Sequence, residues 1–434
     1  MGAVGAALRA LVPGLVGVRR RHLRGERRRT PRAAGAVSGG VGLALASALA
    51  LAGSPGYADA ATDQVPVDSR PSAIAVNPTT NDAYVATDGG VSVIHDASYA
   101  GLLYAGDHPV DVGVNPVTNK VYVSEIGGAV AVVDAVSRAV TSVTVGSSPG
   151  VVTVNPVTNR IYVAVQGGVT IIDGSTLATS FVALPGGAQD IVLNRSTGKI
   201  YVLSAGTLRV LNSAGSVTGT INIGAGGILA VAVNEKTNRV YFTTLAKYGP
   251  SLRVVDGATD TVTATIPSPR NIGRLAVNPA NNQIYVAADS DSIDGFVQVI
   301  DGATRAQVAE IRTASRIVDI VVNPAANKVY VALSGKGTIV VDGRDNSSAV
   351  VYAGQDPVDA DVNVSTGKVY VANAWSRRVT VIDGAAQTPV KNDFKAIRTL
   401  MSWPATLLGS CGFTRVMAPE AGCHASKSGR GGMS

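Results

Sequence analysis

Four aspartates share one position in a repeated sequence pattern. Asp111, Asp190, Asp319 and Asp359 each lie four residues before an asparagine that recurs along the chain at near-constant spacing. Carboxylate oxygens are the ligands that hard cations such as Ca²⁺ take in proteins. If the repeats surround one axis, the four side chains converge on one opening. The pattern therefore predicts a ligand or cation site at that opening.

A simpler interpretation competes with a site. The same position holds Arg274 in one repeat and Ala or Val in three others, while His108, Arg316 and Asp356 occupy the position three residues further upstream. We count Arg274 and His108 among the candidates that surround the opening. An aspartate at the start of a strand, however, commonly accepts backbone N–H groups in a turn. Both interpretations stay open at this stage, as does the metal, if any, that the aspartates hold.

Other patterns of catalysis and metal binding are missing from the sequence. The four histidines, at positions 22, 95, 108 and 424, are too few and too scattered for a zinc or copper site. The glycine-rich stretch 224–227 opens no expected helix, which excludes a phosphate loop. The aspartates of recurrent Asp-Gly pairs, such as Asp173 and Asp256, are expected to form hairpin turns.

The recurring asparagine belongs to a repeat that runs through most of the chain. The phrase Val-Asn-Pro-Val-Thr-Asn-Lys-Val-Tyr-Val at 114–123 returns almost unchanged at 154–163, and looser copies follow at spacings of 38 to 45 residues. We call the first asparagine of each copy the anchor asparagine. The eight anchor asparagines are Asn77, Asn115, Asn155, Asn194, Asn234, Asn278, Asn323 and Asn363.

Each copy predicts four short strands joined by tight turns. An apolar run ends at the anchor asparagine, a turn follows, and a Tyr-Val strand comes next. Only Asn or Gly occupies the place four residues after each anchor asparagine, which we call the turn position, and these residues tolerate a positive φ. The turn positions are Asn81, Asn119, Asn159, Gly198, Asn238, Asn282, Asn327 and Gly367.

Eight such units predict an all-β protein, a β-propeller of eight four-stranded blades spanning residues 61–385. A ring of seven blades with one divergent copy is the alternative. The strand Gln64–Val67 precedes the first copy and is expected to complete the last blade, with residues 386–392 as the rival closing strand. The tyrosine of each second strand is expected to pack in the core or between blades.

The repeat resembles the YVTN β-propeller repeat, named for its Tyr-Val-x-Asn strand. The literal form occurs at Tyr370–Asn373, and other copies keep Tyr-Val and vary the last position. The resemblance covers residues 62–384. The family includes surface-layer proteins and exported bacterial propellers, so the resemblance implies a secreted or cell-surface binding module more than a catalyst.

Residues 1–60 are expected to be an export signal. A block of arginines precedes an apolar stretch, and Ala58-Asp59-Ala60 offers a cleavage site, although an uncleaved membrane anchor is the alternative. The chain carries +7, of which +7 falls in residues 1–60 and +4 in 385–434, which leaves −4 for residues 61–384. We therefore expect no nucleic-acid binding by the ring.

The C-terminal tail, residues 386–434, departs from the repeat, and its order is left open. It contains the two cysteines of the chain, Cys411 and Cys423. Export makes a disulfide between them the favoured state, and two free thiols are the alternative.

These observations favour an exported binding or structural module at the cell surface or outside the cell. We expect a monomer with no catalysis and no cofactor, apart from a Ca²⁺ or other divalent cation if the aspartates hold one. The partner is expected to be a protein or a glycan, and contact with a membrane only through an uncleaved leader. The alternative function is a lactonase-like hydrolase or lyase with a divalent cation at the channel mouth.

Overall fold

The computed structural model describes residues 62–384, apart from residues 104, 105, 107, 223–226, 246–248, 290–294, 314, 336 and 352. The expected export signal, the tail with Cys411 and Cys423, and the rival closing strand 386–392 lie outside the described residues. No helix of sufficient length and apolarity to cross a membrane occurs in the described part of the chain.

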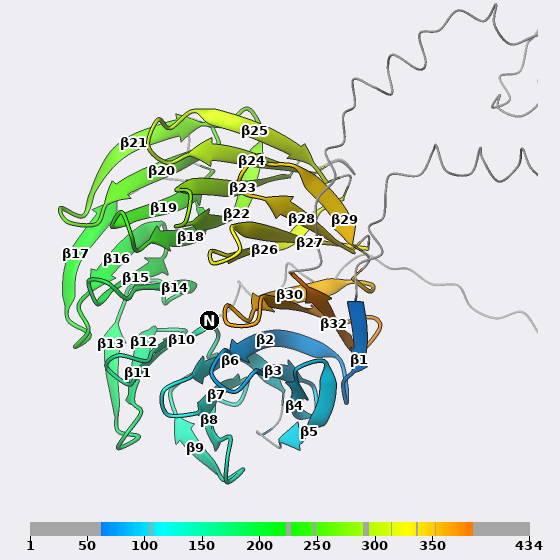
Figure 1. The fold of residues 1–434 in the computed structure, drawn as a ribbon. Helices are drawn as coiled ribbons and strands as arrows, with labels where there is room; N and C mark the ends of the chain where they lie inside the picture. Colours follow the sequence, from blue (N-terminus) through cyan, green and yellow to red (C-terminus); the bar gives the residue numbers. More distant parts are fainter. Residues whose placement is uncertain are drawn as a thin grey trace, which may run out of the picture. The chain divides into compact units, whose positions relative to one another are not determined.

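The described residues form eight four-stranded antiparallel sheets arranged in a ring (Figure 1), which confirms the predicted propeller of eight blades and excludes seven. Neighbouring blades meet through their innermost strands. We number the blades 1 to 8 in chain order and give the strands of each from the innermost outward. Blades 1 to 4 are β2 (Pro71–Asn77), β3 (Asp82–Thr87), β4 (Gly90–His95) and β5 (Ser98–Leu103); β6 (Pro109–Asn115), β7 (Lys120–Glu125), β8 (Ala129–Asp134) and β9 (Val140–Thr144); β10 (Val152–Asn155), β11 (Arg160–Val165), β12 (Gly168–Asp173) and β13 (Thr179–Ala183); and β14 (Asp190–Asn194), β15 (Lys199–Ser204), β16 (Thr207–Leu211) and β17 (Val217–Asn222). Blades 5 to 8 are β18 (Ile228–Asn234), β19 (Arg239–Thr244), β20 (Ser251–Asp256) and β21 (Thr261–Pro267); β22 (Asn271–Asn278), β23 (Gln283–Asp289), β24 (Phe296–Asp301) and β25 (Gln307–Arg312); β26 (Ile317–Asn323), β27 (Lys328–Leu333), β28 (Gly337–Asp342) and β29 (Ser348–Val351); and β30 (Pro357–Val362), β31 (Lys368–Asn373), β32 (Arg378–Asp383) and β1 (Thr62–Pro66).

The eighth blade is built from both ends of the repeat region. Strand β1 pairs antiparallel with β32, so that Gln64 lies opposite Thr380. The two side chains also form a hydrogen bond, from Gln64 Nε2 to Thr380 Oγ1 at 2.8 Å. The predicted closure by the N-terminal strand is therefore confirmed, and it leaves no blade of the ring with fewer than four strands.

The turn after each innermost strand has the predicted conformation. All eight turn positions have a positive φ, between 51° and 77°. Each anchor asparagine is buried, and its side-chain oxygen accepts a backbone N–H from the turn that follows, as from Thr79 to Asn77 at 3.0 Å. The fixed turn sets the register between the first and second strands of every blade.

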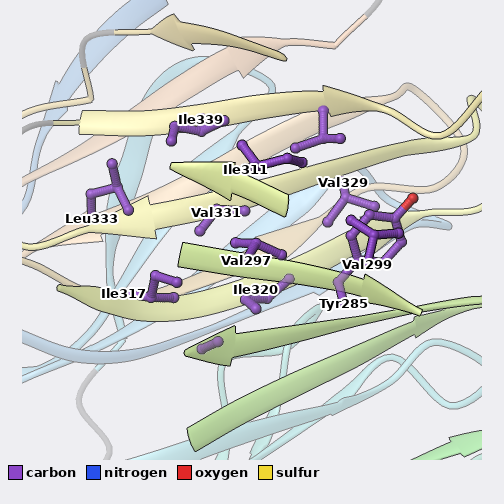
Figure 2. Packing of buried hydrophobic residues seen from close by; sticks show 12 residues of the cluster. Tyr285, Val297, Val299, Ile311, Ile317, Ile320, Val329, Val331, Leu333 and Ile339 are labelled. Carbon is purple, nitrogen blue, oxygen red and sulfur yellow. The ribbon is translucent and has the colours of Figure 1, made fainter. Parts of the chain in front are cut away.

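The core consists of apolar layers between adjacent blades. One such layer joins blades 6 and 7, where Tyr285, Val297 and Val299 pack against Ile320, Val329 and their neighbours (Figure 2). The eight tyrosines of the second strands are fully buried, which confirms their predicted place in the core. Three also donate hydrogen bonds to the next blade: Tyr162 to the Ser213 carbonyl at 2.9 Å, Tyr370 to the Asp96 carbonyl at 2.7 Å and Tyr201 to Asp260 Oδ1 at 3.5 Å.

The Asp-Gly pairs form hairpin turns, as predicted. The Asp173 carboxylate accepts the Ser175 hydroxyl and the backbone N–H groups of Thr176 and Ser175, at 3.1 and 3.0 Å, and these bonds lower the pKa of Asp173 to about 2. The following glycine, Gly174, is required by close packing, because a Cβ there would collide with the side chain of Asn159.

Candidate functional site

The acidic column, the position four residues before each anchor asparagine, lies at a bulge in six of the eight innermost strands, and β10 and β14 are the two without one. The register with the second strand shifts directly before Asp111, Asp319 and Asp359, and in β22 the shift includes Arg274. A bulge re-aims a side chain and increases the local twist. These residues lie at one end of the innermost strands, which we call the start end.

Asp111 and Asp359 connect neighbouring blades. Asp111 Oδ2 accepts the backbone N–H of Val152 in the next blade at 2.8 Å, and Asp359 Oδ2 accepts that of Ile74 at 2.9 Å. The innermost strand is a sheet edge, and its outward N–H groups have no strand partner. The two carboxylates supply acceptors for these groups and so join one innermost strand to the next.

A fifth aspartate, which the sequence reasoning missed, acts in the same way. Asp361 Oδ2 accepts the N–H of Val76 at 2.8 Å, and Oδ1 accepts that of Val362 at 2.7 Å. Asp361 lies two residues after Asp359 and therefore shares its face of the strand. The available signal was its place two residues before the anchor asparagine, where no other copy has a charged residue.

Burial dominates the electrostatics of this group. It raises the pKa of Asp111 and of Asp361 to about 6. Burial also raises the pKa of Asp359 well above its usual range, and the negative charge of Asp319 raises it further. Burial raises the pKa of Asp319 too, although Arg274 opposes that shift, with its Nη1 3.7 Å from Asp319 Oδ1. Each shift means that folding favours the protonated carboxyl group.

Asp190 differs from the other acidic residues of the column. Its Oδ1 accepts only the N–H of the adjacent Ile191 at 2.8 Å, and within the described residues it makes no hydrogen bond to another blade. Burial raises its pKa, and Arg274 opposes that shift. Asp190 lines a cavity of about 600 Å³ together with Arg274 and Arg316, which we call the start-end cavity.

The remaining candidate, His108, is exposed in the turn before β6. It has a positive φ of 57°, and its carbonyl accepts the N–H of Ile126 at 3.4 Å. Within the described residues, no group of three or more Asp, Glu, His or Cys side chains is placed to hold a metal ion. Within the acidic column, Asp111 and Asp359 thus form hydrogen bonds between blades, and Asp190 lines a cavity. The carboxylates do not form a single metal-binding cluster.

A second cavity, of about 880 Å³, lies at the opposite end of the innermost strands, which we call the turn end. Its wall is mostly the apolar stretches of these strands in blades 2 to 7, and Arg195, Glu235 and Lys236 lie at its turns. Strands β10 and β14 have four and five residues and are the two shortest of the innermost strands. Both cavities are lined by residues on or beside these two short strands.

The turn end is held by a ring of amides. In six of the eight blade junctions, the anchor asparagine donates its Nδ2 to the side-chain oxygen of the next blade's turn position, at 2.7 to 3.1 Å. The two junctions without this bond are those where the next turn position is Gly198 or Gly367. The turn asparagines therefore have a role between blades that local turn chemistry does not require.

Comparison with known proteins supports the architecture. No protein-family model matches the chain, and no curated protein matches it. Among solved structures, the computationally designed Ika8 protein is similar with a TM-score of 0.59 and 14% sequence identity, over 74% of this chain and 99% of that one. At this identity the likeness establishes the propeller fold alone.

Proposed function

We propose that the protein is an exported binding or structural module that acts at the cell surface or outside the cell and catalyses no reaction. The observation that carries the proposal is the use of Asp111, Asp359 and Asp361 as acceptors for backbone N–H groups of the next blade. These carboxylates hold the ring together. A hydrolase of the alternative kind would need them directed at a shared cation.

The geometry of a binding module supports the same proposal. The start-end cavity combines Gln189, Asp190, Arg274 and Arg316 with an apolar wall. Ligand sites are typically cavities of roughly 300–1,000 Å³ with a few polar groups in an apolar lining. The repeat's resemblance to exported propellers and the composition of residues 1–60 support export. A protein or a glycan is the proposed partner.

Two measurements test this proposal. Fractionation of the native host, with N-terminal sequencing, is expected to find a mature chain outside the cytoplasm that begins after Ala60. A cytoplasmic protein with an intact N-terminus would refute export. Thermal unfolding with chelator and then with Ca²⁺, Mg²⁺, Mn²⁺ or Zn²⁺ is expected to move the midpoint by no more than about 1 °C.

A matched pair of variants makes the second test decisive. A cation shift of several degrees that disappears in Asp111→Asn/Asp319→Asn, but persists in Asp63→Asn, would overturn the non-catalytic proposal. Asp63 is exposed on β1 and makes a suitable control. Lactone and ester hydrolysis by the cation-loaded protein would then be the activity to measure.

A further inference from the structure

The wall of the start-end cavity includes a positively charged side chain, that of Arg316, which does not stabilise the fold. Within the described residues, the Arg316 side chain is exposed and takes part in no hydrogen bond or ion pair, although its backbone carbonyl accepts the N–H of Ser334 at 2.9 Å. Other arginines of the ring hold blades together, as Arg160 does through the Ser213 carbonyl at 2.7 Å. Arg316 is therefore free to pair with an external anion.

The other charges of the cavity are only partly engaged. Arg274 lies 3.7 Å from Asp319, which is a loose contact, and its side chain is 59% exposed. Asp190 has one hydrogen bond, from Ile191, and its second oxygen has no donor among the described residues. The cavity thus offers two guanidinium groups and one carboxylate oxygen that lacks a hydrogen-bond donor.

The rest of the wall sets the shape and polarity of a fitting ligand. Leu203, Leu229 and Ile317 supply apolar surface, and the side-chain amide of Gln189 can donate or accept. The nearby carboxylate disfavours a compact dianion such as phosphate and favours a ligand with hydroxyl donors. The guanidinium groups favour a carboxylate, to which a planar fork binds in two places.

We propose that the start-end cavity binds a small hydroxylated carboxylate of the kind found in uronic acids, the acidic sugars of many glycans. Arg316 pairs with the carboxylate and Arg274 supports it. Asp190 and Gln189 bind the hydroxyl groups, and the apolar wall packs against the C–H face of the sugar ring. This assignment deepens the proposed function, because it names the chemistry of the glycan partner.

The test is calorimetric titration of the full chain with D-glucuronate, D-glucose and inorganic phosphate. We expect binding of glucuronate and much weaker binding of the other two. In Arg316→Gln we expect the Kd for glucuronate to rise at least tenfold, which corresponds to about 1.4 kcal/mol. Asp190→Asn is expected to weaken glucuronate binding as well, since Asp190 accepts from a hydroxyl.

The chain supplies a matched control. Arg70 occupies the equivalent place in blade 1, seven residues before its anchor asparagine, and its carbonyl also accepts a backbone N–H, from Asp88 at 3.2 Å. Blade 1 is not part of the cavity wall, so Arg70→Gln is expected to leave the Kd unchanged. Equal losses in Arg70→Gln and Arg316→Gln would overturn the assignment, as would equal binding of glucose or stronger binding of phosphate.

This assignment and the proposed function fail in different ways. If the exported protein retains a partner from an envelope glycan preparation while glucuronate does not bind, the cavity assignment is wrong and the proposed function stands. If the chain remains in the cytoplasm, the proposed function is wrong whatever glucuronate does.

Discussion

The two ends of the innermost strands are built on different rules. At the turn end, every blade has a buried anchor asparagine, and six junctions repeat the same amide-to-amide bond. At the start end, the equivalent position holds aspartate in four blades, Arg274 in one and apolar residues in three. A column that repeats in every blade serves the closure of the ring. A column whose residues vary between blades creates an arrangement of side chains that occurs at only one place in the ring. A specific ligand site needs such an arrangement.

Asn278→Ala, at the turn end, is expected to cause the largest change in stability. The change removes the bond from Asn278 Nδ2 to Asn327 Oδ1 at 2.7 Å, and it removes the buried side-chain oxygen that accepts the N–H of Ala280. Loss of buried hydrogen-bond partners costs about 1–3 kcal/mol per group, so we expect about 2–4 kcal/mol less stability by urea unfolding.

Asn323→Ala is the control for that experiment. Asn323 also accepts a turn N–H, from Ala326 at 3.1 Å, but the next turn position is Gly367, which has no side chain to receive its amide. Its loss of stability is therefore expected to be smaller by about 1 kcal/mol. Equal losses in the two variants would contradict a role for the amide ring between blades.

The start end is expected to make stability depend on pH. Asp111 and Asp361 have folded pKa values of about 6, raised by burial above the ordinary value of 3.8. A raised folded pKa means that the stabilisation is complete below the unfolded pKa and is lost as pH rises through the folded value. For each of these two carboxyl groups we expect a loss of stability on the order of 2 kcal/mol between pH 4 and pH 7.

The hairpin aspartates have the opposite effect, because they lower the stability of the fold at low pH. Hydrogen bonds lower the folded pKa of Asp173, Asp256 and Asp301, so their stabilisation is present above the unfolded pKa and is lost as pH falls further. Together, the buried aspartates and the hairpin aspartates predict that the stability of the fold is greatest near pH 4–5. Asp359→Asn is expected to lower the unfolding midpoint less at pH 8 than at pH 4, because the amide loses one of the two acceptors that Ile74 and Ala360 use but removes the buried charge. A variant that loses stability equally at both pH values would show that charge burial is not the cause.

A smaller gain is expected from completing the amide ring. Gly198 and Gly367 have φ values of 71° and 77°, which asparagine tolerates, and an added Cβ would meet only ordinary contacts at 3.9 and 3.7 Å. Gly198→Asn and Gly367→Asn are each expected to stabilise the ring by about 1 kcal/mol. The measurement is thermal unfolding, with Gly198→Ala and Gly367→Ala as controls that lack the amide.

The smallest effect is expected from Arg316→Gln. Because its side chain is exposed and makes no described contact, we expect its stability to stay within about 0.5 kcal/mol of the native chain. A clear loss of stability in urea unfolding would show that Arg316 helps to hold the ring together. The start end would then serve closure of the ring, as the turn end does.

The sequence predicted the features that depend on one blade at a time. The repeat spacing, the Asn or Gly at the turn position and the Asp-Gly hairpins are local signals, and the closing strand before Pro71 followed from counting strands. The amide ring was not predictable, because it depends on how Asn278 of one blade faces Asn327 of the next. The start-end cavity was not predictable either, because its wall combines residues of five blades, such as Gln189, Arg274 and Arg316, and no single repeat specifies how they meet.

The closure of the eighth blade decides when the ring can finish forming. The partners in β1 and β32 are separated by 316 residues, as between Gln64 and Thr380. Seven blades can assemble in order as the chain emerges, but the ring stays open until residue 383 is available. If the chain crossed a translocation pore from its N-terminus, its first strand would reach the far side long before the strand that it pairs with, and the complete ring would form only after residue 383 had crossed.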